Sequence, residues 1–451
     1  MTGNPQPAPA RTILALGDAF YDPVAAADFP QAIMRFRNDR AAAEIGVDEL
    51  NDDAWVRHFG RFEPILGSLG EPLALRYHGH QFRQYNPEIG DGRGFLFAQF
   101  RDRAGRLVDL GTKGSGKTPY SRFGDGRLTL KGGVREILAT EMLEALGVPT
   151  SRTLSLIETG EALERNDEPS PTRAAVLVRL SHSHIRIGTF QRLAYHRDAE
   201  NMARLVDYVL VNLLDQPGGP DGPARLLDAV VARTARLAAS YMAAGFVHGV
   251  LNSDNINVTG ESFDYGPWRF TPTWDPAFTA AYFDHAGLYA FGRQPEAIHW
   301  DALQLAVSLR LIADAEPLIA SLDTFPERYQ AAVTDALLWR LGVVPRGDSQ
   351  DRAVIQAVEQ ALRSTNGSID RFFFDAFGGT LPAEDAFADA RGALTGYAPR
   401  KPRDHDYWRG EPCSLLIDEV EAIWSAIDER DDWVPLHAKV AAIRAMGAAL
   451  S

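Results

Sequence analysis

The order of strand-like and helix-like patterns along the 451 residues predicts an α+β fold with two lobes. In the first half, short runs such as 94–100 alternate in the manner of strands. Past Ala199 the apolar residues recur at helical spacing instead, over 202–214, 224–244 and several later segments. Loops rich in Gly, Asn and Asp lie near the change of pattern. We therefore expect a strand-rich lobe followed by a helical lobe.

The first elements are expected in a simple order. The Pro- and Ala-rich start, 1–11, predicts disorder, and 52–59 predicts a short helix. Residues 94–100 and 107–110 are expected to pair as strands across the turn at 103–106.

A helix and a second hairpin are expected next. The helix covers about 133–146, where apolar residues recur every fourth position, and Gly147 ends it. Residues 153–157 and 174–180 predict two strands joined by a longer polar loop.

These patterns divide the chain into four parts. They are an N-terminal extension (1–75), the strand-rich lobe (76–198), the helical lobe (199–325) and a C-terminal helical region (326–451). With 45% hydrophobic and 24% charged residues, the chain can bury a sizeable core.

The charge balance narrows the expected partners. Lys and Arg number 46 against 60 Asp and Glu, which gives −14 and argues against general binding to nucleic acid or an anionic membrane. The single cysteine, Cys413, excludes an intrachain disulfide. No signal peptide and no apolar run of about 18 residues is recognisable, so we expect a cytoplasmic protein.

One loop carries the most informative pattern. Residues 248–255 read His-Gly-Val-Leu-Asn-Ser-Asp-Asn, and Asp264-Tyr-Gly follows. The spacing of His248, Asn255 and Asp264 is similar to that of protein kinases, in which H-R-D-x-x-x-x-N precedes D-F-G. There the Asn and the second Asp hold metal ions that bridge the nucleotide phosphates. Together with the order of the lobes, the loop predicts a protein-kinase-like bilobal fold.

The carboxylate of this loop has moved relative to the kinase pattern. Val250 stands where a kinase has its catalytic Asp, and it can neither accept a proton nor coordinate a metal. Asp254 instead precedes Asn255 directly. An ordinary Asn- and Asp-rich turn is the alternative. The succession of a helix, this loop, a hairpin near 256–258 and then Asp264 favours the kinase-like interpretation.

Lys113 admits three interpretations. Residues 111–118 satisfy the P-loop pattern G-x-x-x-x-G-K-[ST]. A proline and two glycines follow Thr118, however, so the helix that a P-loop requires is not expected. In the favoured interpretation, Lys113 follows the strand at 107–110 and pairs with Glu136 of the next helix, like the strand lysine and helix glutamate of kinases. A surface lysine and a helix N-terminal glutamate favoured by the macrodipole are the third interpretation, which would be preferred without the loop at 248–255.

Other residues of phosphate-binding type lie nearby. Gly90, Gly92 and Arg93 form a glycine-rich turn that could approach a phosphate, although an ordinary hairpin turn would look the same. Arg179 and Arg186 lie between the lobes and would suit a polyphosphate, although scattered surface arginines are commoner. No Cys or carboxylate completes a metal-ligand spacing around three histidines, for which we expect structural roles: His182, His184 and His248.

Taken together, the motifs resemble the SelO/YdiU family of pseudokinases, whose members act as protein adenylyltransferases. The resemblance covers about residues 16–311. The segments that carry it are 77–82, 89–93, 113–122, 124–127, 135–136, 183–190, 248–255 and 264–267.

This resemblance implies an activity. ATP would be bound inverted relative to kinases, and AMP would pass to Ser, Thr or Tyr hydroxyls of proteins, the enzyme itself among the candidate acceptors. Some bacterial members are also associated with UMP transfer when manganese is present. A kinase-like phosphotransferase and a non-catalytic ATP-binding pseudokinase are the alternatives; Val250 argues against the first and Asp254 against the second.

The resemblance also implies roles for individual residues. Asp254 would be the proton acceptor, and Asn255 and Asp264 would hold Mg²⁺ or Mn²⁺. The nucleotide would be contacted by Gly90, Gly92, Arg93, Lys113 with its partner Glu136, Asp125, Gly126, Arg179 and Arg186.

Two departures from the family pattern are visible. Arg83 stands where the family commonly has Gly. After about residue 397 the usual C-terminal pattern is lost, and no terminal Cys or selenocysteine motif occurs. Redox control through a C-terminal thiol is therefore not expected, and nothing supports Cys413 as a substitute.

Overall fold

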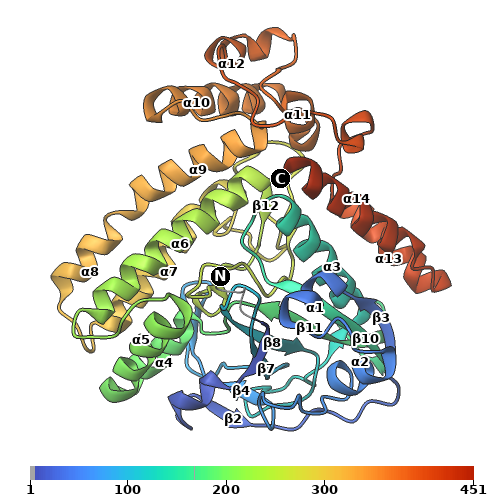
Figure 1. Cartoon of the computed structure of the whole chain (residues 1–451), viewed down its shortest axis with the longest axis vertical. Coiled ribbons are helices and arrows are strands. Elements are labelled where there is room, and N and C mark those ends of the chain that lie inside the picture. Colours follow the sequence, from blue (N-terminus) through green and yellow to red (C-terminus); the bar gives the residue numbers. More distant parts are fainter. Residues whose placement is uncertain (1–5, 167) are drawn as a thin grey trace.

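The chain folds into one large antiparallel sheet and a group of helices (Figure 1). The computed structural model describes residues 6–166 and 168–451. Seven strands of the sheet follow the order β2-β4-β7-β8-β11-β10-β3, while β1 pairs with β7 and β9 with β11. The strands are β1 (Ala8–Ala10), β2 (Tyr21–Pro23), β3 (Ile33–Arg37), β4 (Leu73–Leu75), β7 (Leu96–Arg101), β8 (Leu107–Lys113), β9 (Leu128–Thr129), β10 (Arg152–Leu163) and β11 (Thr172–Ser181). The predicted mixture of α and β structure is confirmed.

The two predicted hairpins form the middle of the sheet. β7 and β8 pair antiparallel with Phe100 opposite Val108, and β10 and β11 pair with Leu156 opposite Leu177. Every residue of β8 is buried. Successive side chains of a strand point to opposite faces, and both faces of this sheet are covered by apolar cores.

The first 75 residues contribute strands to this same sheet. β1 pairs with β7, so the disorder predicted for 1–11 is wrong for Ala8–Ala10, while residues 1–5 lie outside the described range. Helix α2 (Asp52–Phe59) has the predicted bounds, and its Trp55 is fully buried in the core on one face of the sheet.

Helix α3 (Leu130–Ala145) contacts the other side of the sheet and starts three residues before its predicted beginning at 133. The side chain of Thr129 accepts a hydrogen bond from the backbone N–H of Gly132, which caps the helix earlier than the apolar pattern suggests. Gly147 follows the helix with φ of 74°, in the left-handed conformation that glycine favours.

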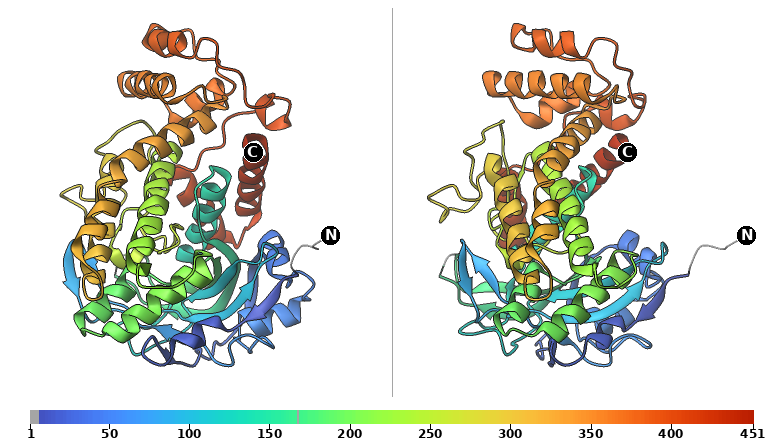
Figure 2. Two further views of the ribbon diagram at one scale, coloured as in Figure 1. Left: turned by 60° about the vertical axis from the view of Figure 1, so that its left-hand side comes forward. Right: turned by 90° about the vertical axis from the view of Figure 1, so that its left-hand side faces the viewer.

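The helices at the C-terminal end return to α3. In Figures 1 and 2, α13 (Ile417–Arg430) and α14 (Val434–Leu450) lie beside α3, far along the chain from it. The Arg444 guanidinium of α14 donates to the Glu141 carboxylate of α3 at 2.5 Å, across a separation of 303 positions. The sheet and α14 thus both support α3.

The remaining helices, apart from α1 against β10, make up the helical part of the molecule. The long α6 is buried along most of its length, and α10 to α12 lie at the end opposite the sheet (Figure 2). Within the described ranges, none of the helices combines the length and apolarity needed to cross a bilayer. Their bounds are α1 (Asp39–Ile45), α4 (Ile187–Tyr195), α5 (Ala199–Leu213), α6 (Gly222–Ala244), α7 (Gln294–Leu309), α8 (Ala315–Leu322), α9 (Phe325–Leu341), α10 (Asp348–Thr365), α11 (Ile369–Ala376) and α12 (Ala388–Ala393).

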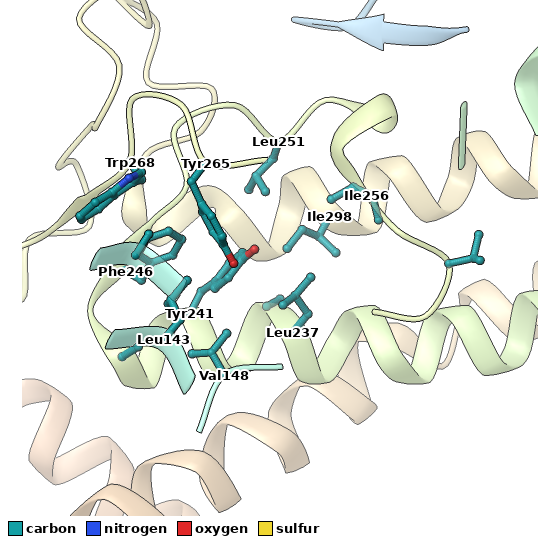
Figure 3. Close-up of a cluster of buried hydrophobic side chains, with 14 of the residues drawn as sticks. Leu143, Val148, Leu237, Tyr241, Phe246, Leu251, Ile256, Tyr265, Trp268 and Ile298 are labelled. Carbon is teal, nitrogen blue, oxygen red and sulfur yellow. The ribbon is translucent and has the colours of Figure 1, made fainter. Parts of the chain in front are cut away.

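The loops between α6 and α7 rest on a packed apolar cluster. Leu251, Ile256 and Tyr265 reach into it from these loops and meet Leu237 and Tyr241 of α6 (Figure 3). This packing fixes the position of the polar residues that lie between these apolar residues in the sequence.

The hairpin predicted near 256–258 is wrong. Asn257 instead forms an isolated bridge with Arg186, and Ser262 forms one with Thr150. The short apolar run pairs with distant segments because it lies between the sheet and α6. The small two-stranded sheet here joins β12 (Phe246–Val247) to β13 (Arg269–Phe270).

Candidate active site

A cavity of about 910 Å³ is lined by β8, β11, two glycine-rich turns and the loops after α6. Seven lining side chains are Lys or Arg and five are Asp or Glu, in contrast to the acidic chain as a whole. Glu136 and Asn255 lie outside the lining. The other predicted site residues all line it: Gly90, Gly92, Arg93, Lys113, Asp125, Gly126, Arg179, Arg186, Asp254 and Asp264.

Lys113 projects from the end of β8 into a buried ion-pair network. Its ammonium group pairs with the carboxylate of Glu136 on α3 and lies 2.9 Å from Asp264 Oδ1. The Lys113 and Glu136 side chains are only 4% and 1% exposed. The structure thus brings together the pair that the sequence suggested, while phosphate binding by Lys113 stays a prediction.

The P-loop interpretation does not agree with the structure. Residues 111–113 belong to β8, and turns and the short strand β9 lie between Thr118 and the start of α3 at Leu130. The loop 111–118 therefore does not lead directly into a helix, as a P-loop would require. Lys117, the lysine of that pattern, is exposed and outside the cavity lining.

Asp264 lies at the end of the cavity that is lined by Lys113, Arg179 and Arg186, which we call the cationic end. Its Oδ1 lies 2.9 Å from Lys113 Nζ and 3.5 Å from a terminal nitrogen of Arg179. Burial alone would raise its pKa, but Lys113 and Arg179 hold the pKa of Asp264 well below the usual range. Asp264 is therefore ionised at all physiological pH values.

Two buried arginines complete this end. Arg186 donates to Asp91 Oδ1 at 3.2 Å and to the Asp254 carbonyl at 3.0 Å, and its guanidinium lies 4.3 Å from the Tyr77 ring centre. Arg186 Nε and Arg179 Nη1 are buried without a hydrogen-bond partner in the described chain. Unpartnered guanidinium N–H groups are costly to bury, so an anion at this position would satisfy them.

Asp254 has quite different surroundings. It lies in a 3-10 turn (Ser253–Asn255), and its Oδ1 is buried with no hydrogen-bond partner among the described residues. Burial raises the pKa of Asp254 to about 6, although Arg186 opposes the shift. A carboxylate with a free oxygen and a raised pKa is suited to accept a proton.

Hydrogen bonds to neighbouring residues hold the ends of this loop. The His248 N–H donates to Gln294 Oε1 of α7 at 3.0 Å, and its ring nitrogen Nε2 lies 3.0 Å from the Phe263 carbonyl. Asn255 Nδ2 donates to the Val250 carbonyl at 3.0 Å. His248 therefore has a structural role, and Val250 contributes its backbone carbonyl, not its side chain, to holding the loop.

A small hairpin, β5 (Gly79–Gln81) and β6 (Gln84–Asn86), covers the same loop. The His80 N–H donates to Ser253 Oγ at 2.7 Å, and Ser253 Oγ in turn donates to Gln191 Oε1 at 2.6 Å. A Cβ at Gly79 would lie 2.8 Å from Asp254, so only glycine allows this approach. Sequence motifs flagged this hairpin, but not its contact with Asp254.

The turn of the hairpin explains the departure at Arg83. Its φ of 61° lies in the left-handed region that glycine adopts without strain. Arg83 nevertheless fits there, because its guanidinium pairs with Glu296 at 3.0 Å and lies 5.4 Å from the Trp300 ring. Both partners belong to α7.

The glycine-rich turns pack against each other. A Cβ at Gly90 would lie 2.5 Å from the Tyr120 ring, and one at Gly92 would lie 2.8 Å from the Tyr120 carbonyl. Gly126 has φ of 72°, and neighbouring Asp125 forms an ion pair with Arg165 at 2.8 Å. Packing between the turns is therefore sufficient to require glycine at these positions.

One buried carboxylate was not identified from the sequence. Asp301 on α7 has no exposed surface, and neither of its carboxylate oxygens has a hydrogen-bond partner among the described residues. Burial, followed by the charge of nearby Asp254, raises the pKa of Asp301 well above its usual range. No local pattern marks a lone Asp in an amphipathic helix as special.

The donor types suit a hard divalent cation. Asn255 and Asp264 supply oxygen atoms, which Mg²⁺ and Mn²⁺ prefer, and the free Asp254 oxygen is close in sequence. The described residues contain no group of three His, Cys, Asp or Glu side chains arranged to hold a metal by themselves. Such a site fits an ion shared with substrate phosphates, which the unpartnered arginines also favour.

Known proteins are similar to this chain over most of its length. The family model described as Protein adenylyltransferase SelO matches residues 9–381. The chain belongs to the SelO family. It is 44% identical to the protein nucleotidyltransferase YdiU of Gloeobacter violaceus, over 95% of this chain and 93% of the relative. The YdiU protein of Synechocystis is 43% identical over 94% and 95%, and that of Synechococcus elongatus is 52% identical over 73% and 66%.

SelO membership makes the chain an enzyme of the nucleotidyltransferase class. The match extends beyond the resemblance seen in the sequence, because it includes helices up to α11. The cavity of this SelO protein combines a buried lysine, buried arginines and two carboxylates with opposite pKa shifts.

Proposed function

We propose that this SelO protein transfers AMP from ATP to hydroxyl groups of proteins. The observation that carries the proposal is the buried Asp254, which lines a cavity with a cationic end and has a carboxylate oxygen without a hydrogen-bond partner among the described residues. Val250 at the kinase-base position argues against ordinary phosphotransfer.

The proposal includes a kinase-like bilobal arrangement with ATP inverted. The pairing of Lys113 with Glu136, next to Asp264, supports the first part. In the inverted orientation the outer phosphates meet Lys113, Arg179 and Arg186, and the α-phosphate is presented toward Asp254. The family to which the chain belongs supports this orientation.

Each residue then has a chemical task. The acceptor hydroxyl oxygen forms a bond to the α-phosphorus as the bond to the β-phosphate oxygen breaks, and pyrophosphate leaves. Asp254 takes the hydroxyl proton, and the buried cations stabilise the charge on pyrophosphate. Asn255 and Asp264 would hold Mg²⁺ or Mn²⁺, which supplies charge neutralisation at the phosphates when bound.

ATP labelled separately on the α- and γ-phosphate tests the proposal. Protein, either a substrate or the enzyme itself, should acquire label only from α-labelled ATP, with Mg²⁺ or Mn²⁺ present. Label only from γ-labelled ATP would indicate a phosphotransferase, and ATP binding without either label would indicate a non-catalytic pseudokinase.

A parallel reaction with α-labelled UTP addresses the nucleotide. The relatives are named nucleotidyltransferases without a specified base, so UMP transfer with Mn²⁺ is the second candidate. Stronger labelling from UTP than from ATP would replace AMP by UMP in the proposal.

A further inference from the structure

Phe123 is the most exposed large apolar side chain of the described residues, with a relative exposure of 107%. It nevertheless lines the 910 Å³ cavity, at the tip of the turn 120–127.

The turn is anchored so that this ring stands free. Ser121 Oγ donates to the Gly92 carbonyl at 2.5 Å, and the Gly124 N–H donates to the Ser121 carbonyl at 2.7 Å. Arg122 adopts φ of 51°, which turns the chain sharply just before Phe123. The backbone on both sides is therefore fixed while the ring is not packed.

The other aromatic rings of the lining are already engaged. The Tyr77 ring lies under the Arg186 guanidinium, 4.3 Å from it. The Tyr120 ring packs against Gly90, and its hydroxyl donates to the carboxylate of Asp22. Phe123 is left as the ring that can meet a ligand.

Charge distinguishes the two ends of the cavity. At one end, Arg179 and Arg186 retain buried N–H groups without hydrogen-bond partners among the described residues. Around the turn that bears Phe123, Arg165 is paired with Asp125 and Arg127 with Glu161, both at 2.8 Å, while Arg122 is exposed. Phosphates suit the first end, where the cations are buried, and the base of the ligand suits the second, where two of the three arginines are already paired.

We propose that Phe123 stacks on the base of the bound nucleotide and so contributes to nucleotide selection. This inference rests on the proposed function. Stacking on an aromatic side chain is open to any base, since each has a π-face, and the larger purine offers more overlap than a pyrimidine. Phe123 should therefore favour ATP over UTP without excluding UTP.

Calorimetric titration of ATP and of base-free tripolyphosphate, with Mg²⁺, tests this inference. Phe123→Ala should weaken ATP binding about 5- to 150-fold and leave tripolyphosphate binding unchanged, because only ATP has a base to stack. Phe123→Trp should restore ATP binding. Tyr282→Ala, which removes a ring that is 78% exposed but outside the cavity lining, serves as the control.

Two results would overturn the inference: unchanged ATP affinity in Phe123→Ala, or equal losses for ATP and tripolyphosphate. The second would mean that the turn had rearranged. Failure of the wild-type protein to bind ATP would instead refute the proposed function, so the two failures can be told apart.

Discussion

Asp254 and Asp264 line the same cavity and lie ten positions apart, Asp254 buried and Asp264 partly buried, yet their surroundings shift their pKa values in opposite directions. Asp264 is held by Lys113 and Arg179, and its pKa falls well below the usual range. Asp254 keeps an unpartnered oxygen, and burial raises its pKa to about 6. A carboxylate fixed in its charged form can hold cations, whereas one that is poorly stabilised in that form can take up a proton.

The contrast shows that in this fold the pKa of a carboxylate depends on which element supplies its neighbours. The sheet supplies Lys113 and Arg179 to Asp264, whereas Gly79 lies against Asp254 and leaves no room for a charged partner on that side. The predictions below test this division, from the largest expected effect to the smallest.

Exchanging each carboxylate for its amide should separate catalysis from binding. We expect Asp254→Asn to lower the transfer rate by about 10²–10⁴-fold with ATP affinity retained, because a proton acceptor acts mainly in the transition state. Asp264→Asn should weaken metal-dependent ATP binding as well. Transfer assays and calorimetry with and without Mg²⁺ measure both. Equal loss of ATP binding in the two variants would make Asp254 a metal ligand and abolish the contrast.

The cationic end can be tested at Lys113. Lys113→Ala should reduce transfer by about 10²–10³-fold, comparable with the loss of other preorganised electrostatic groups. Lys117→Ala, the matched control on the same loop, should have little effect because Lys117 is exposed and outside the lining. A larger loss of initial transfer rate in Lys117→Ala than in Lys113→Ala would support the P-loop interpretation instead.

Asp301 provides a third carboxylate, buried without a hydrogen-bond partner among the described residues, and its effect should appear in stability. Its raised pKa means that the folded state retains a proton which the unfolded state releases, so its contribution to stability is lost as pH rises from about 4 toward the folded-state pKa. Asp301→Asn cannot ionise. Its advantage in free energy of unfolding over the wild type should grow by up to about 1.4 kcal/mol per pH unit.

Denaturant unfolding of both proteins at pH 5, 6.5 and 8 measures this difference. Asp335→Asn, at an exposed position of α9, is the control and should show no such trend. A constant difference between wild type and Asp301→Asn across the pH range would show that Asp301 ionises freely in the folded protein.

The smallest effect is expected at Arg83, which joins the hairpin over Asp254 to α7. Arg83→Ala keeps the left-handed backbone strain and loses the partly exposed ion pair, which costs about 1 kcal/mol or less. Arg83→Gly loses the same ion pair but relieves the strain, so it should be more stable than Arg83→Ala. Thermal unfolding compares the two variants. A less stable glycine variant would show that the turn imposes no strain.

Much of the fold followed from local patterns. The strand alternation at β7 and β8 and the helical spacing of α5 and α6 were sufficient, because each of these elements buries a continuous apolar face. The start of α3 was misplaced because a cap residue decided it, and the hairpin near 256–258 failed because its apolar run pairs with residues distant in sequence. Local sequence carries no information on such partners.

The candidate site likewise has features that the sequence predicted and features that it did not. The pairing of Lys113 with Glu136 was predicted from the order of strand, lysine and helix together with the loop at 248–255, and the structure confirms this ion pair. The role of Asp254 as proton acceptor stays a prediction. Asp301 and the contact of Gly79 with Asp254 lie outside any such order, because they depend on how α7 and a short hairpin pack on the loop. A neighbour in space that has no fixed spacing in sequence can be found only from the structure.

The contact of α14 with α3 has a consequence for the time course of folding. Helix α3 bears Glu136, and its outer side is held by Arg444 through a bond to Glu141 that spans 303 positions. Contacts between such distant positions close a long loop and form slowly. We therefore expect the sheet to form first and the lysine–glutamate pair to reach its final geometry only when α14 docks, which makes competence for nucleotide one of the last properties that the folding chain acquires.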